Sequence, residues 1–106
     1  MATYQAKNYL ITGAGRGIGR GLSRLLLQNG HRVFLVDVNG EELSHTTERL
    51  SESHSHGKDF DSAVCDLRES DQIRNAVQHA SGFFGHYLDV LINNAANTSA
   101  VGATPL

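Results

Sequence analysis

Glycine residues are concentrated in one short window near the start of the sequence. Five of the eleven glycines lie at positions 13 to 21, and the window opens with the run Thr12-Gly13-Ala14-Gly15-Arg16-Gly17-Ile18-Gly19. Backbone N–H groups at the start of a helix can bind a phosphate, and the helix dipole favours its negative charge, provided that no side chain intervenes. Since glycine has no side chain, the window predicts a phosphate-binding loop.

The spacing of these glycines narrows the class of phosphate ligand. We expect Gly13 to allow a tight turn, Gly17 to let the backbone approach a pyrophosphate, and Gly19 to let the helix pack closely on the strand. The N–H group of Ile18 would then lie beside the ligand. The spacing is G-x-x-x-G-x-G, and no Lys-Ser/Thr pair follows, as it does in nucleoside-triphosphate loops. The window therefore favours a dinucleotide.

An acidic residue at the end of a later apolar run bears on which dinucleotide binds. Asp37 lies eighteen residues beyond Gly19, where a carboxylate would accept hydrogen bonds from the adenosine ribose. A carboxylate there also repels a 2′-phosphate, which favours NAD as the cofactor. Arg16, within the loop, would offer a cation to the same phosphate, so NADP stays open as the alternative.

The residues around the window predict the elements that hold it. Residues 7–12 indicate a buried strand, and residues 33–36 indicate a second one. Between them we expect an amphipathic helix that ends at Asn29-Gly30. Its apolar face would carry Ile18, Leu22, Leu25 and Leu26, and its solvent face Arg20, Arg24 and Gln28. The order strand, glycine turn, helix, strand is a βαβ unit.

Weaker signals continue the same alternation. A mostly solvated helix is predicted over 41–53, a third strand over 60–65 and a fourth over 90–92, while 97–106 reads as loop. Between the third and fourth strands we expect a helix that Ser70 caps and that Gly82 or Gly85 ends. Its apolar face would carry Ile73, Ala76, Val77, Ala80 and Phe84.

This alternation predicts an α/β fold. Right-handed crossovers place the connecting helices on both faces of a parallel sheet, so we expect one domain over 1–106 with a Rossmann-type, doubly wound architecture. The sheet would be truncated after about four strands. One side of its last strand is then left unpaired.

These residues resemble the short-chain dehydrogenase/reductase family. The window fits its T-G-x-x-x-G-x-G motif, and Asp37 is similar to its ribose-binding acid. Asp66 resembles its adenine-contacting Asp, and the run Asn93-Asn94-Ala95-Ala96 resembles its N-N-A-G motif, with Ala96 in place of the usual glycine. Asn93 would lie near the nicotinamide-side ribose, and the Asn pair would tie the fourth strand to its neighbours. With the loop, the resemblance gives nine cofactor-binding residues: Gly13, Arg16, Gly17, Ile18, Gly19, Asp37, Asp66, Asn93 and Ala95.

The resemblance also implies a chemical step, hydride transfer between a nicotinamide and a carbonyl or alcohol substrate. The family uses a Tyr and a Lys from a Y-x-x-x-K motif, together with a Ser. In this sequence Tyr4, Tyr9 and Tyr87 are followed four residues later by Asn8, Gly13 and Leu91. We therefore predict no catalytic residue, an inactive chain by itself, and a small-molecule substrate only in a longer form.

Two other hypotheses fit the same residues. The chain could be a non-catalytic dinucleotide-binding or interaction module that forms an oligomer through its open sheet edge. It could also be a remnant without a stable fold, since half of the contacts that support such a sheet would be missing.

Composition excludes several other classes. The 9 Lys and Arg residues against 11 Asp and Glu residues give a formal net charge of −2, so no nucleic acid and no membrane surface is expected as a partner. The single Cys65 excludes an intrachain disulfide framework, and no apolar run approaches the ~20 residues that span a bilayer. His54 and His56 lack a third ligand nearby, so no metal is expected. Without a signal-peptide pattern, we expect a cytoplasmic protein.

Overall fold

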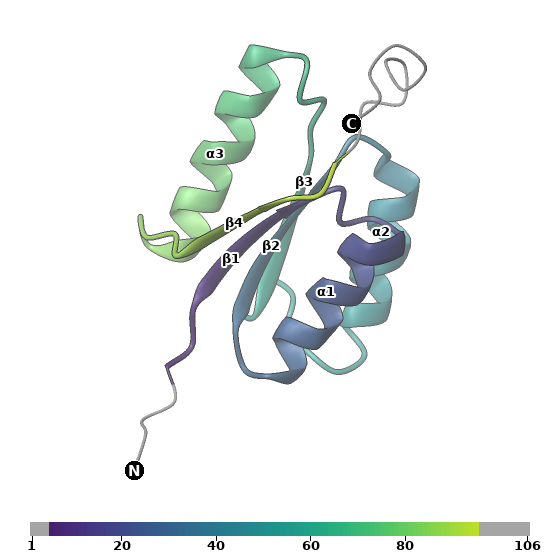
Figure 1. The fold of residues 1–106 in the computed structure, drawn as a ribbon, viewed down its shortest axis with the longest axis vertical. Helices are drawn as coiled ribbons and strands as arrows, with labels where there is room; N and C mark the ends of the chain where they lie inside the picture. Colours follow the sequence, from purple (N-terminus) through teal and green to yellow (C-terminus); the bar gives the residue numbers. More distant parts are fainter. Residues whose placement is uncertain (1–4, 96–106) are drawn as a thin grey trace, which may run out of the picture.

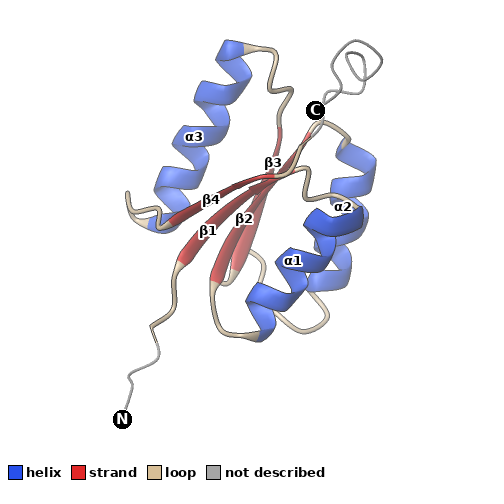
Figure 2. Cartoon of the chain, viewed as in Figure 1, coloured by secondary structure: helices blue, strands red, loops and turns tan. Residues whose placement is uncertain are grey.

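The computed structural model describes residues 5–95, which form a parallel sheet with helices on both faces (Figures 1 and 2). Within these residues the strand order is β3-β2-β1-β4, and every neighbouring pair is parallel. The predicted α/β, doubly wound class is therefore confirmed. The loop predicted for 97–106 lies outside the described residues. The elements are β1 (Asn8–Thr12), α1 (Gly17–Gln28), β2 (Arg32–Asp37), α2 (Gly40–Leu50), β3 (Phe60–Val64), α3 (Ser70–Phe84) and β4 (Val90–Asn93).

Strand β2 shows how the core is divided between the two faces. Val33 and Leu35 pack with α1 and α2, whereas Phe34 and Val36 pack with α3 on the opposite face. Side chains alternate between the two faces of a strand, so a strand buried on both faces needs a continuous apolar run. This explains why residues 33–36 are all apolar.

The parallel pairing brings the carboxyl ends of the four strands together at one end of the sheet. Thr12 at the end of β1 is in register with Val36 on β2 and with Asn93 on β4, and Asp37 is in register with Val64 on β3. The chain leaves β1 toward β2 on one side and later returns to β4 on the other. The space outside the carboxyl ends of β1 and its neighbours is therefore a topological switch point, where open α/β sheets bind ligands.

Helix α1 is turned relative to the predicted orientation. Its buried residues are Gly19, Ser23 and Leu27, while Ile18 is 74% and Leu25 is 54% exposed. The prediction that Ile18 and Leu25 share the buried face is therefore wrong. So is the placement of Arg20 toward solvent, because Arg20 Nε donates to Thr46 Oγ1 of α2 at 3.1 Å.

The contact between Arg20 and α2 also explains the uncovered apolar residues of α1. At about 100° per residue, Ile18 and Leu25 lie roughly opposite Arg20 on the helix. Helix α2 packs on β2 and β3, and α1 packs on β1 and β2. The flank opposite α2 therefore points toward the β4 side of the sheet.

Helix α3 shows the same effect on the other face. Ala76, Ala80 and Phe84 are buried as predicted, but Ile73 and Val77 are exposed. His79 Nε2 lies 3.2 Å from Asp61 Oδ2 of β3, so the flank with Val77, roughly opposite, faces away from β3.

The ends of α3 agree with the sequence only in part. The N-cap is Glu69 rather than the predicted Ser70, and the left-handed residue Gly85 follows the last turn. Gly85 is therefore the residue that ends this helix.

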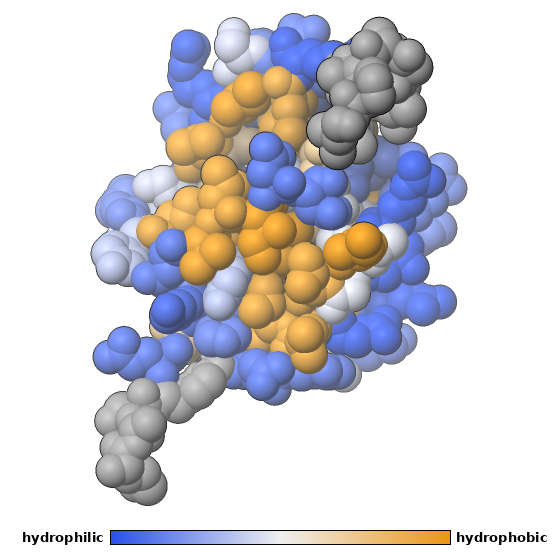
Figure 3. Space-filling model, viewed as in Figure 1, coloured by the Kyte–Doolittle hydropathy of each residue, from blue (hydrophilic) through white to orange (hydrophobic). Residues whose placement is uncertain are grey.

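Strand β4 is the sheet edge nearest to these flanks. It pairs only with β1 among residues 5–95, and its Leu91 is 59% exposed. Figure 3 shows apolar surface gathered over β4 in the middle of that view. The unpaired side predicted for the last strand is thus present in the described part of the chain.

No helix among residues 5–95 is long and apolar enough to cross a membrane.

Candidate functional site

The glycine window forms the turn between β1 and α1. Gly13 and Gly17 have φ values of 65° and 61°, a left-handed conformation that side chains disfavour. The Ala14 N–H donates to the Val36 carbonyl at 3.1 Å, which fixes the turn against β2. A Cβ atom at Gly17 would meet nothing within 4 Å. Gly17 is therefore required by its backbone conformation and borders open space.

Gly19 is required by close packing instead. A Cβ atom there would overlap the Gly13 carbonyl oxygen and would lie 2.9 Å from the Ala14 Cα atom. The close approach expected of Gly19 is present, and its partner is the turn at residues 13–14 rather than the strand itself. The turn and the first turn of α1 thus form one packed unit.

The first turns of α1 and α2 differ in whether side chains cap their free backbone N–H groups. The N-cap of α1, Arg16, makes no side-chain capping bond, and the first turn holds no acidic residue. In α2 the Asn39 side chain accepts a hydrogen bond from Glu42 N, and Glu41 and Glu42 lie in the first turn. Unsatisfied N–H groups at a helix start need an acceptor. The N-terminus of α1 is therefore left open to an anion.

Thr12 ties this loop to the end of β4. Its Oγ1 accepts hydrogen bonds from Asn94 N and Ala95 N, both at 3.0 Å, and donates to Asn93 Oδ1 at 3.1 Å. Asn94 Nδ2 donates to the Gly13 carbonyl at 3.2 Å. The Asn pair therefore connects β4 to β1, as the resemblance implied.

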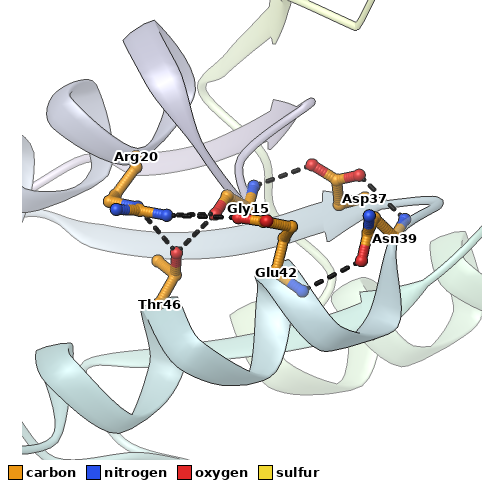
Figure 4. A network of polar contacts seen from close by, with 6 residues as sticks. All are labelled: Gly15, Arg20, Asp37, Asn39, Glu42 and Thr46. Atoms are coloured by element: carbon orange, nitrogen blue, oxygen red, sulfur yellow. Dashed lines mark hydrogen bonds and ion pairs between the residues drawn. The ribbon is translucent and has the colours of Figure 1, made fainter.

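The Asp37 carboxylate is held at the end of β2 by two backbone donors. Gly15 N donates to Oδ2 at 2.8 Å and Asn39 N donates to Oδ1 at 2.9 Å (Figure 4). An ionised carboxylate offers about four acceptor positions, so one remains on each oxygen. Two adjacent hydroxyl groups are the kind of donor pair that such a carboxylate can bind.

Sequence reasoning missed the central role of Gly15. A Cβ atom at this position would lie 2.9 Å from Asp37 Oδ2 and 3.0 Å from Leu43 N. Its carbonyl accepts hydrogen bonds from Thr46 Oγ1 at 2.6 Å and from Arg20 Nη2 at 3.1 Å. The only sequence signal was a further glycine inside the window.

Asp66, after β3, is strongly engaged by a nearby cation. Its Oδ1 accepts from Arg68 N and Nε, both at 3.0 Å, and its Oδ2 accepts from Arg68 Nη2 at 2.9 Å. These bonds lower the pKa of Asp66 to about 2. One acceptor position on Oδ2 is left for a ligand.

The neighbouring Cys65 has the character of a core residue. Burial, and secondarily the charge of Asp66, raises the pKa of the Cys65 thiol. A thiol held protonated in this way is a poor nucleophile.

One pocket of about 630 Å³ joins these segments. Seven of the nine predicted residues line it, namely Gly13, Arg16, Gly17, Asp37, Asp66, Asn93 and Ala95. Of the other two, Ile18 is exposed in the first turn of α1 and Gly19 is buried under the loop. Sequence reasoning also missed Val38 and Leu67, two exposed apolar residues of the lining.

Arg16 and Asp37 line the same pocket with opposite charges. The Arg16 side chain is exposed and makes no hydrogen bond or ion pair within residues 5–95. Among those residues, no group of three His, Cys, Asp or Glu side chains is arranged to hold a metal ion.

Comparison with known proteins identifies this arrangement. The sequence model of one family, described as short chain dehydrogenase, matches residues 7–105. The chain belongs to the short-chain dehydrogenase family. The match supports an oxidoreductase family and does not favour the alternative of a non-catalytic module.

Individual relatives agree with the family assignment. The 1-deoxy-11-beta-hydroxypentalenate dehydrogenase of Streptomyces avermitilis is 36% identical over 92% of this chain. A solved actinorhodin polyketide ketoreductase with NADPH superposes with a TM-score of 0.77 at 36% identity, over 92% of this chain and 36% of its own. An NAD⁺-bound xylitol dehydrogenase superposes with a TM-score of 0.75 at 32% identity, over 86% of this chain and 34% of its own. This chain spans about a third of its curated relative's length, 35% for the Streptomyces enzyme.

Proposed function

We propose that this chain binds a nicotinamide adenine dinucleotide, NAD in preference to NADP, as the cofactor-binding part of a short-chain oxidoreductase. The observation that carries the proposal is the Asp37 carboxylate, which is held at the end of β2 in the same pocket as the glycine loop. Solved relatives with NADPH and with NAD⁺ support the general cofactor class.

The loop at the start of α1 suits the cofactor's pyrophosphate. The first turn of α1 has neither a side-chain cap nor an acidic residue, so its N–H groups and the positive end of the helix dipole are available to a negative ligand. Gly17 leaves open space above the backbone. These features favour a diphosphate at this position.

The far side of the pocket suits an adenosine. Asp37 has one acceptor position left on each carboxylate oxygen for the two ribose hydroxyls, and a 2′-phosphate there would meet its negative charge. Val38 and Leu67 supply apolar surface for the adenine ring, and Asp66 Oδ2 keeps one acceptor position for an adenine N–H group. The exposed guanidinium of Arg16 is the feature that favours NADP instead.

The whole protein's reaction is proposed as hydride transfer to a carbonyl or from an alcohol. The bound nicotinamide supplies the hydride chemistry. In this chain, Asn93 and Ala95 would lie at the nicotinamide end of the pocket and orient that part of the cofactor. No Tyr of this sequence has a Lys four residues later, so we expect the 106-residue chain by itself to give no turnover.

Calorimetric titration of the 106-residue chain with NADH and then NADPH tests the proposal. We expect saturable binding, tighter for NADH. Hydrogen bonds to a charged group are worth about 1.5–3 kcal/mol, so Asp37→Asn should weaken NADH binding ~10- to 100-fold and remove the preference against NADPH. Glu48→Gln, which removes a charge outside the pocket, is the matched control.

Two outcomes would contradict the proposal in different ways. A chain that is folded by circular dichroism but binds neither cofactor would exclude a dinucleotide site. Tighter binding of NADPH than of NADH would leave the site in place and overturn the choice of NAD.

A further inference from the structure

We infer that Thr46 of α2 and Arg20 of α1 are positioning residues for the cofactor, because they fix the orientation of the Gly15–Arg16 peptide group in the phosphate loop. This inference rests on the proposed function. Neither side chain lines the pocket, so both would act through the loop backbone and not by touching the ligand.

The Gly15 carbonyl is held by a closed set of hydrogen bonds. Thr46 Oγ1 donates to the Gly15 oxygen at 2.6 Å and accepts from Arg20 Nε at 3.1 Å, while Arg20 Nη2 donates to the same oxygen at 3.1 Å (Figure 4). Thr46 is only 1% exposed. The Thr46 hydroxyl thus both donates and accepts a hydrogen bond within the interior, where such bonds are electrostatically stronger than in water.

Glu42 keeps the Arg20 side chain on the α2 side of the loop. Arg20 Nη2 lies 3.4 Å from Glu42 Oε2, and both side chains are about one-third exposed. A cation in the first turns of α1 would otherwise be free to reach toward a bound phosphate. The pairing instead commits this guanidinium to the Gly15 carbonyl and to Thr46.

Fixing the Gly15 carbonyl also fixes the N–H group of the next residue. In a trans peptide the C=O and the following N–H point in opposite directions, and this chain has no cis peptide in its described part. The Gly15 oxygen points to Thr46, so the Arg16 N–H points away from Thr46. Within residues 5–95 this N–H has no hydrogen-bond partner, and Arg16 lines the pocket. The Arg16 N–H group is therefore a preoriented donor that is available to a ligand.

The N–H group of Gly15 connects the restrained loop to Asp37, the residue proposed to bind the ribose. Gly15 N donates to Asp37 Oδ2 at 2.8 Å. Glycine has the least restricted backbone of all residues, so an unanchored Gly15 would rotate and release this carboxylate. Thr46 and Asp37 thus act on the cofactor through one shared residue, and their effects should be coupled.

A pair of threonines in α2 provides the test. Thr46→Val removes the hydroxyl that reaches Gly15, whereas Thr47→Val removes one that donates to the Ser44 carbonyl of its own helix. With the NADH titration, we expect Thr46→Val to weaken binding about 3- to 10-fold. Thr46→Ser, which keeps the hydroxyl, and Thr47→Val should stay within about twofold of the unmodified chain.

Two further measurements separate positioning from a loss of stability. If Thr46 acts through Gly15 on Asp37, Thr46→Val should weaken NADH binding less in the Asp37→Asn variant than in the unmodified chain. If the two sites were independent, the losses of binding free energy would add. Without any cofactor, the amide NMR resonances of Gly15 and Arg16 should shift in Thr46→Val and not in Thr47→Val. Arg20→Lys, at a partly exposed position, should shift the same resonances if Thr46→Val does not fold.

The outcomes distinguish this inference from the proposed function. NADH binding of unchanged affinity in Thr46→Val, or equal losses in Thr46→Val and Thr47→Val, would overturn the positioning role and leave the proposed function standing. Fully additive effects of Thr46→Val and Asp37→Asn would also overturn it. Failure of the unmodified, folded chain to bind NADH would overturn both.

Discussion

Replacing Gly19 with alanine should disrupt the phosphate loop, whereas the same replacement at Gly21 should stabilise the chain. A Cβ atom on Gly19 would overlap the Gly13 carbonyl oxygen and lie 2.9 Å from the Ala14 Cα atom, and both are backbone atoms that cannot rotate away. A Cβ atom on Gly21 would meet nothing within 4 Å. The two glycines lie in the same helix, so each variant is the control for the other.

The expected magnitudes follow from two opposing effects. Alanine in place of glycine inside an exposed helix stabilises by about 1 kcal/mol, and this is the whole effect at Gly21. At Gly19 the same gain is offset by overpacking, which costs about 3 kcal/mol when backbone must move. We therefore expect Gly19→Ala to lower the free energy of unfolding by about 2 kcal/mol. With a urea m-value of about 1.5 kcal/mol/M, the midpoints would move by about −1.3 M and +0.7 M.

Urea unfolding followed by far-UV circular dichroism measures both variants, and an NADH titration in parallel reports on the loop. Gly19→Ala should bind NADH more weakly even where it is fully folded, since Gly13 and Ala14 must shift to admit the methyl group. The reasoning would be refuted if Gly19→Ala were as stable as the unmodified chain. It would also be refuted if Gly21→Ala were destabilised by as much as Gly19→Ala.

Three further changes test other parts of the site. Thr12→Val removes the acceptor of two backbone N–H groups, including that of Asn94. It should lower the free energy of unfolding, measured by urea denaturation, by about 2–4 kcal/mol. Thr12→Ser keeps the hydroxyl and should lower it much less. The Asp66 carboxyl has a pKa of about 2 against an ordinary value of 3.8, so its contribution to stability is present above pH 3.8 and is lost as the pH falls toward 2. Arg68→Gln should raise this pKa toward 3.8 in a carbon NMR titration, and an unchanged titration would contradict the assigned cause. The raised pKa of Cys65 keeps the folded thiol protonated above its ordinary value of 9.0, so stability should fall as the pH rises above 9.0. Iodoacetamide at pH 8 should modify Cys65 only after unfolding, and rapid reaction of the folded chain would contradict its burial.

The sequence predicted those parts of the fold that local residues determine. Residues 33–36 are apolar without interruption, and the structure buries them on both faces of the sheet as β2. Gly13 and Gly17 have the left-handed conformations that only glycine adopts readily. These signals depend on neighbours within a few positions, which is why they can be read from the sequence.

The rest depends on contacts between distant segments. The orientation of α1 follows from Arg20, whose partner Thr46 lies 26 residues later, and helical spacing alone cannot reveal that pair. The importance of Gly15 likewise requires the position of Asp37, 22 residues away. The apolar period of α1 includes Ile18 and Leu25, but both are exposed, because they lie roughly opposite the contact between Arg20 and α2.

The hydrogen bonds of Thr12 bear on the order in which the site assembles. Its partners Asn94 and Ala95 lie 82 and 83 residues later in the chain. During synthesis Thr12 leaves the ribosome 82 residues ahead of Asn94, the residue that connects it to β4. β1, α1 and β2 can pair while the nascent chain is short, but the hydrogen bonds that join Thr12 and Gly13 to Asn94 form only after β4 has docked. A cofactor that needs the finished loop would therefore bind only after β4 has docked, and its binding would lock that late step in place.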